Sequence, residues 1–92
     1  MYSALQSDTL VNMNKTPIIY SANWCAFCHA VKQYFDKQSI KYEVRDIEEN
    51  PEFATESVNK SGQMGIPVID INGIIIVGFD RPKIDAALTA SK

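Results

Sequence analysis

The sequence predicts an α/β domain whose elements follow the order β-α-β-α-β-β-α. Its 92 residues, 46% of them hydrophobic, are enough for one domain with one modest core. The apolar run Pro17–Tyr20 leads into a segment with helical spacing, and a strand–helix–strand unit implies a right-handed parallel crossover. The dipeptide Asn72-Gly73 separates two apolar runs and predicts an antiparallel hairpin. Together these patterns predict a mixed four-stranded sheet flanked by helices.

The first half of the chain divides into an N-terminal arm and three expected elements. Residues 1–15 follow neither a helical nor a strand period, so we expect an arm or short helix there, ahead of a domain spanning residues 16–92. The apolar residues of segment 16–21 do not alternate with polar ones, which is typical of a strand in the middle of a sheet. From Phe27 to Phe35 the apolar residues recur at helical spacing. Segment 40–44 alternates in polarity, as half-exposed strands do.

The second half carries clearer boundary signals. Asn50 followed by Pro51 predicts the start of a helix, and Gly62 predicts its end. Asp80 is positioned to cap a last helix after the hairpin. The residues expected to be buried in these two helices are Phe53, Ala54 and Val58 in the first, and Ile84, Ala87 and Leu88 in the second.

Composition excludes several functional classes. The net charge is −2, with nine basic and eleven acidic residues dispersed along the chain, so we expect no nucleic-acid or membrane partner. The longest apolar run, Ile74–Val77, is far shorter than the roughly 20 residues of a membrane helix. The N-terminus has no apolar core of signal-peptide length, and two cysteines do not make a structural disulfide framework. We therefore expect a monomeric cytoplasmic protein.

Cys25 and Cys28 are the chain's two cysteines, and they stand where the first strand gives way to a helix. Unpaired N–H groups and the helix dipole favour negative charge at a helix N-terminus, so a cysteine there ionises more readily than a free thiol. Thiolate is the form that attacks disulfides. The pair therefore indicates thiol–disulfide exchange, in which Cys25 attacks and Cys28 resolves. The alternative is half of a zinc or iron–sulfur site, but zinc needs four ligands and His29, the one histidine, points too far round the helix to contribute.

Three motifs resemble those of the thioredoxin superfamily, and within it the glutaredoxin-like branch. They are Tyr20-Ser21…Cys25-Ala26-Phe27-Cys28, then Gly65-Ile66-Pro67-Val68, and last Gly78-Phe79-Asp80-Arg81-Pro82. The resemblance covers roughly residues 16 to 90 and implies a glutaredoxin-type thioredoxin fold. Two finer features, His29-Ala30 directly after Cys28 and Gly78-Phe79 before Arg81-Pro82, resemble the NrdH-redoxins, which take electrons from thioredoxin reductase.

The resemblance implies further site residues around the cysteines. Pro67 is expected to follow a cis peptide bond, leaving the backbone of Ile66 free to pair with an extended substrate chain. Trp24 and Phe27 are each either core residues or part of an apolar rim that docks protein disulfides. Three more residues, in the last motif, are expected beside the substrate: Gly78, Phe79 and Asp80.

The expected activity is that of a protein-disulfide oxidoreductase serving electron transport and cell redox homeostasis. Its clients are protein disulfides, and its redox centre is the Cys25–Cys28 pair, with no bound cofactor and no metal. NrdH-redoxins and many glutaredoxins carry a cation three residues before the first cysteine, where this chain has Ala22. Glutaredoxins also carry a Gly-Gly pair in the last motif, where this chain has Val77-Gly78. We therefore expect weak glutathione binding and recycling by a flavoenzyme of the thioredoxin reductase type. A glutathione-dependent glutaredoxin is the alternative.

Overall fold

The computed structural model of the chain describes residues 16–90. The elements are β1 (Ile18–Ser21), α2 (Ala26–Lys37), β2 (Glu43–Asp46), α3 (Pro51–Ser61), β3 (Val68–Ile71), β4 (Ile74–Val77) and α4 (Arg81–Ala90). The predicted element order is confirmed. The arm or short helix expected for residues 1–15 lies outside the described residues. Within the described range, no helix is both long and apolar enough to cross a bilayer.

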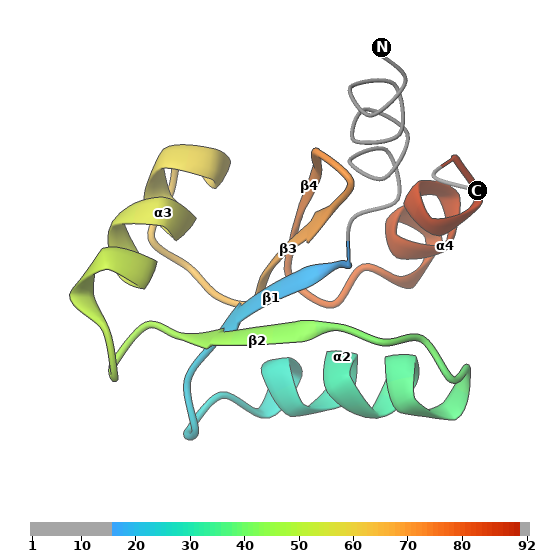
Figure 1. Cartoon of the computed structure of the whole chain (residues 1–92), viewed down its shortest axis with the longest axis horizontal. Helices are drawn as coiled ribbons and strands as arrows, with labels where there is room; N and C mark the ends of the chain where they lie inside the picture. Colours follow the sequence, from blue (N-terminus) through green and yellow to red (C-terminus); the bar gives the residue numbers. More distant parts are fainter. Residues whose placement is uncertain (1–15, 91–92) are drawn as a thin grey trace, which may run out of the picture.

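The four strands form one mixed sheet in the order β2-β1-β3-β4 (Figure 1). Strand β1 pairs with β2 in parallel and with β3 in antiparallel orientation, so β1 lies inside the sheet, as its unbroken apolar run predicted. Strands β3 and β4 form the predicted hairpin. Asn72 and Gly73 both adopt positive φ angles, 54° and 93°. A two-residue hairpin turn of type I′ requires positive φ at both positions.

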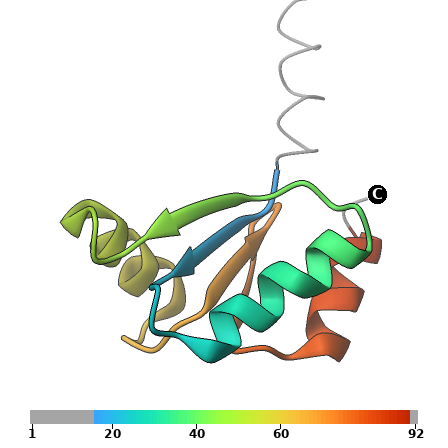
Figure 2. The ribbon, with the colours of Figure 1, turned by 90° about the horizontal axis from the view of Figure 1, so that it is seen from below.

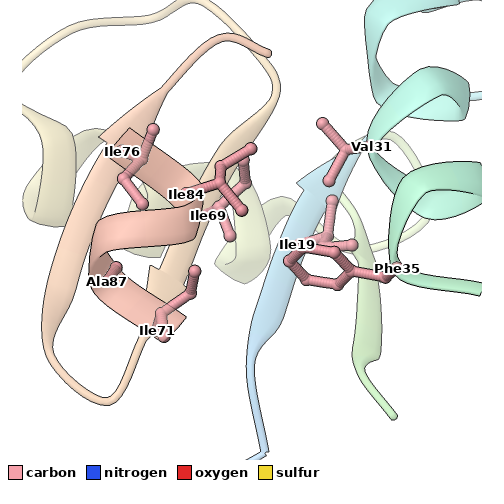
Figure 3. Packing of buried hydrophobic residues seen from close by; sticks show 8 residues of the cluster. All are labelled: Ile19, Val31, Phe35, Ile69, Ile71, Ile76, Ile84 and Ala87. Carbon is pink, nitrogen blue, oxygen red and sulfur yellow. The ribbon is translucent and has the colours of Figure 1, made fainter. Parts of the chain in front are cut away.

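The helices cover the two faces of the sheet unequally. Helices α2 and α4 lie on one face and α3 lies on the other (Figure 2). The main apolar core fills the space between the sheet and helices α2 and α4 (Figure 3). Its members are Ile19, Val31, Phe35, Ile69, Ile71, Ile76, Ile84 and Ala87.

The predicted helix boundaries agree with the local geometry. The Asn50 side chain accepts a hydrogen bond from the Glu52 backbone N–H at 2.9 Å, and Pro51 is the first residue of α3. Gly62 ends α3 in the left-handed conformation, with φ at 74°. At the start of α4, the Asp80 carboxylate accepts from the Lys83 N–H at 3.2 Å.

The prediction of which residues form the buried face of α3 is wrong. Ser57 is the residue of α3 that is buried, whereas Phe53 and Ala54 are half-buried and Val58 is 38% exposed. The physical reason is that polar side chains make many of the contacts between α3 and the sheet. The apolar residues of α3 therefore do not indicate which side of the helix is buried.

The strand expected over segment 40–44 begins later than predicted, at Glu43. Ile40 and Tyr42 still pack against the main core, but they do so from the connection that precedes β2. Val44 is exposed because β2 is an edge strand, with β1 as its neighbour on one side.

Candidate active site

Three segments that are far apart in sequence meet at one end of the sheet, where β1 and β4 end and β3 begins. The β1–β3 register pairs Tyr20 with Val68, so the loop carrying Cys25 leaves the sheet beside the residue that precedes β3, Pro67. The N–H of Gly78, just after β4, donates to the carbonyl oxygen of Pro67 at 2.8 Å. The register thus gathers the three motifs that the sequence analysis singled out.

Cys25 and Cys28 form a disulfide whose Cα atoms are 5.2 Å apart. Cys25 is the N-cap of α2, and its Sγ accepts a hydrogen bond from the Cys28 backbone N–H at 3.1 Å. Cys28 is fully buried and Cys25 is 6% exposed, which is low for a residue expected to attack client disulfides. Cys25 is nevertheless the more exposed residue of the pair, and its sulfur accepts the hydrogen bond from the Cys28 N–H at the helix terminus.

The loop before β3 presents an open stretch of backbone. The Ile66–Pro67 peptide bond is cis, and Pro67 is buried. The Gln63 side chain holds Gly65 from both sides, since its Nε2 donates to the Gly65 carbonyl at 3.0 Å and its Oε1 accepts from the Gly65 N–H at 2.5 Å. Within residues 16–90, neither the N–H nor the C=O of Ile66 makes a hydrogen bond.

Large apolar side chains around the cysteines are exposed. Trp24 is 67% exposed, and Phe27, on the first turn of α2, is exposed to a similar extent. Neither belongs to the main core. Met64, two residues before Ile66, is 84% exposed and was not singled out from the sequence, because a lone methionine in a loop carries no periodic signal.

Two polar side-chain contacts hold the loop that carries Trp24, and neither is predictable from the local sequence. The Trp24 indole Nε1–H donates to Oε2 of Glu48 at 2.6 Å. On the other side, Nε2 of His29 lies 2.8 Å from the Asn23 carbonyl oxygen. Since that oxygen can only accept, Nε2 carries the proton. Glu48 is 24 residues from Trp24, so only the sheet register reveals their proximity.

The last motif points partly away from the cysteines. Phe79 is half-buried, and its ring meets the edge of Tyr34 of α2 with the centroids 5.8 Å apart. The Arg81 guanidinium lies 4.7 Å from the centroid of the Tyr34 ring, and the Tyr34 hydroxyl bonds to Asp85. Asp80 is engaged in capping α4. Of this motif, Gly78 is the residue bonded to the loop beside the cysteines.

Residues 16–90 contain no group of three or more His, Cys, Asp or Glu side chains placed to hold a metal ion. One copy of the described domain therefore offers the two sulfurs of Cys25 and Cys28, which is half of a tetrahedral zinc site.

The glutaredoxin family model matches residues 18–76. A glutaredoxin-like 8.6 kDa protein of the Clostridium pasteurianum rubredoxin operon is 36% identical over 67 residues, covering 73% of this chain and 89% of that protein. The glutaredoxin-like protein NrdH of Lactococcus lactis (strain IL1403) is 35% identical over 65 residues, covering 71% and 88%. The structure of NrdH-redoxin from Escherichia coli has a TM-score of 0.69 at 26% identity, covering 78% and 93%. The chain therefore belongs to the glutaredoxin family, as a thiol–disulfide protein with a Cys-x-x-Cys pair.

Proposed function

We propose that this protein reduces protein disulfides by a dithiol mechanism, in which Cys25 attacks and Cys28 resolves. The observation that carries the proposal is the placement of the pair at the N-terminus of α2, with the Cys28 N–H donating to the Cys25 sulfur. In the reduced protein the same donor and the helix terminus stabilise a thiolate on Cys25. Burial of Cys28 keeps it from clients until Cys25 has bonded to one.

The electrons balance in two exchange steps. The Cys25 thiolate attacks one sulfur of the client disulfide, forming a mixed disulfide and expelling the other client sulfur as a thiolate. The Cys28 sulfur, after losing its proton, attacks Cys25 and expels the second client thiolate. The client gains two electrons, and the Cys25–Cys28 disulfide that remains is the form seen in the structure.

The surroundings of the pair support a protein client. Trp24, Phe27 and Met64 offer exposed apolar contact area, and the free backbone groups of Ile66 can pair with an extended chain. Pro67 and Gly78 hold that backbone in place through their hydrogen bond. The surface is suited to an unfolded or looped segment that presents its disulfide beside an apolar side chain.

We further propose that a flavoenzyme of the thioredoxin reductase type, with NADPH, recycles the disulfide faster than glutathione does. Ala22 is fully buried where a glutathione-binding cation would stand, and Val77 adds a side chain where many glutaredoxins carry glycine. The loss of one hydrogen bond to a charged group costs roughly 1.5–3 kcal/mol, or about ten- to a hundredfold in affinity. The Ile66 backbone and Asp80 leave a weak glutathione site. The chain is also similar to NrdH proteins, one of which is described as having a thioredoxin-like activity profile. This similarity supports recycling by the flavoenzyme.

Trapping and recycling assays test the two parts of this function. A Cys28→Ser variant should accumulate mixed disulfides with client proteins through Cys25, whereas Cys25→Ser should trap none. Trapping by Cys25→Ser in place of Cys28→Ser would reverse the assigned roles. Stoichiometric zinc or iron in the isolated protein, lost in Cys28→Ser, would instead support a shared metal site. Side-by-side recycling with each reductant decides the donor, and efficient recycling by glutathione alone would identify a glutathione-dependent glutaredoxin.

A further inference from the structure

Trp24 is the chain's single tryptophan, and it is restrained although it is largely exposed. An exposed side chain normally changes rotamer within nanoseconds. Here the indole Nε1–H donates to the Glu48 carboxylate at 2.6 Å, within the short range of hydrogen bonds to charged acceptors. The ring that precedes Cys25 therefore has one preferred position before any client arrives.

Glu48 itself lies on a well-fixed turn between β2 and α3. The Asp46 carboxylate oxygen Oδ1 accepts from the backbone N–H groups of Glu48 at 2.8 Å and of Glu49 at 3.2 Å. The Ile47 N–H donates to the carbonyl of Ser21, the last residue of β1, at 2.9 Å. The acceptor for Trp24 is thus attached to the same strand end from which the Trp24 loop departs.

The loop is also held from the α2 side. His29 donates to the Asn23 carbonyl, and the Cys25 N–H donates to the Ala22 carbonyl at 3.1 Å. The backbone at residues 22–25 is therefore fixed independently of Glu48, so removing the Glu48 carboxylate should free the indole without displacing Cys25.

We propose that Glu48 is a positioning residue that holds the Trp24 indole as a preformed wall of the client-docking surface. The proposal rests on the proposed function and extends it to a residue outside the three motifs. Ordering a side chain on binding lowers affinity, by an amount of about 0.5–1.5 kcal/mol for a flexible one, or roughly two- to twelvefold. Glu48 removes that cost for protein clients. A small disulfide that does not span the rim gains nothing from it.

The test compares Glu48→Ala with Glu49→Ala. The Glu49→Ala substitution removes the same charge one residue further on, and the Glu49 side chain makes no hydrogen bond or ion pair within residues 16–90. With insulin as the protein disulfide, Glu48→Ala should raise KM about threefold and leave kcat unchanged. With 2-hydroxyethyl disulfide both parameters should stay as in the unmodified protein. Fluorescence anisotropy of Trp24 should fall in Glu48→Ala alone, and Glu48→Gln, which keeps an acceptor, should restore much of both properties.

A double variant separates this role from a general effect of charge. In a Trp24→Phe background, which has no indole donor, Glu48→Ala should have no further effect on KM. Equal effects of Glu48→Ala and Glu49→Ala, or unchanged anisotropy, would overturn the assignment while leaving the proposed function intact. If the unmodified protein reduces neither substrate, the proposed function fails and this assignment fails with it.

Discussion

The two faces of the sheet are joined to their helices by different forces. Beneath α2 and α4, the side chains of Phe35, Ile69 and Ile84 are fully buried and make no polar contact. Beneath α3, the Tyr20 hydroxyl donates to Oε1 of Glu56 at 2.9 Å, and Arg45 donates to the same oxygen at 2.6 Å. The face covered by α2 and α4 is stabilised mainly by burial of apolar side chains. The face covered by α3 also depends on hydrogen bonds between side chains.

Ion pairs link α3 to the sheet. Lys60 of α3 lies 2.7 Å from the Asp70 carboxylate of β3, and Arg45 also bonds to Glu43 at 2.6 Å. The Tyr20 hydrogen bond, followed by the interactions with Arg45, holds the pKa of Glu56 below its ordinary value, although burial acts in the opposite direction. The hydrogen bond to Glu43 is the largest cause of the raised pKa of Arg45.

This difference bears on the active site. Cys25 and Cys28 are carried by α2, which packs on the sheet face covered mainly by buried apolar side chains. Glu48 belongs to the turn that leads to α3, on the polar face. We therefore expect acid to loosen α3 before it disturbs the cysteine pair.

The largest expected effect comes from the apolar face. Phe35→Ala removes a fully buried ring and should lower the free energy of unfolding by about 3–5 kcal/mol. Val58→Ala, on the outer part of α3, should cost less than about 1 kcal/mol because that side chain is already partly exposed. Urea unfolding followed by circular dichroism measures both. Equal losses would show that the two faces do not differ as described.

The polar face should give a smaller, coupled effect. Tyr20→Phe removes one hydroxyl donor and should lower the free energy of unfolding by about 1 kcal/mol. In a Glu56→Ala background the same change should cost almost nothing, because the acceptor is already gone. Additive losses in this double-mutant cycle would mean that the Tyr20–Glu56 bond contributes no net stability.

The smallest expected effect is a dependence on pH. Because folding lowers the pKa of Glu56, its carboxylate stabilises the fold above its ordinary pKa of 4.5, and this stabilisation is lost as the pH falls through the lower folded value. The side chain is 39% exposed, so solvent screening should limit the contribution to less than about 1 kcal/mol. The stability difference between the unmodified protein and Glu56→Gln should shrink on acidification. A difference that stays constant with pH would contradict this account.

Local signals made most of the fold predictable. Asn50-Pro51, Gly62 and Asn72-Gly73 each set a boundary through their own backbone preferences, and the structure places boundaries there. Periodicity failed for α3 because a helix held by polar contacts shows no apolar stripe.

At the site, the sequence identified the residues whose chemistry is visible locally, such as Cys25 and Cys28. It could not identify Glu48, because the hydrogen bond to Trp24 exists only once β1 and β2 are in register. It also could not foresee the low exposure of Cys25, which depends on how the neighbouring loops pack around it.

The direction in which the chain enters and leaves the domain has a practical consequence. Strand β1 starts at the end of the sheet away from the cysteines, and α4 runs back from Asp80 toward that same side (Figure 1). Ile18 and Ala90 therefore lie apart from the loop that carries Trp24 and Cys25. A fluorescent label placed at either of these described ends would therefore not cover the surface beside Cys25.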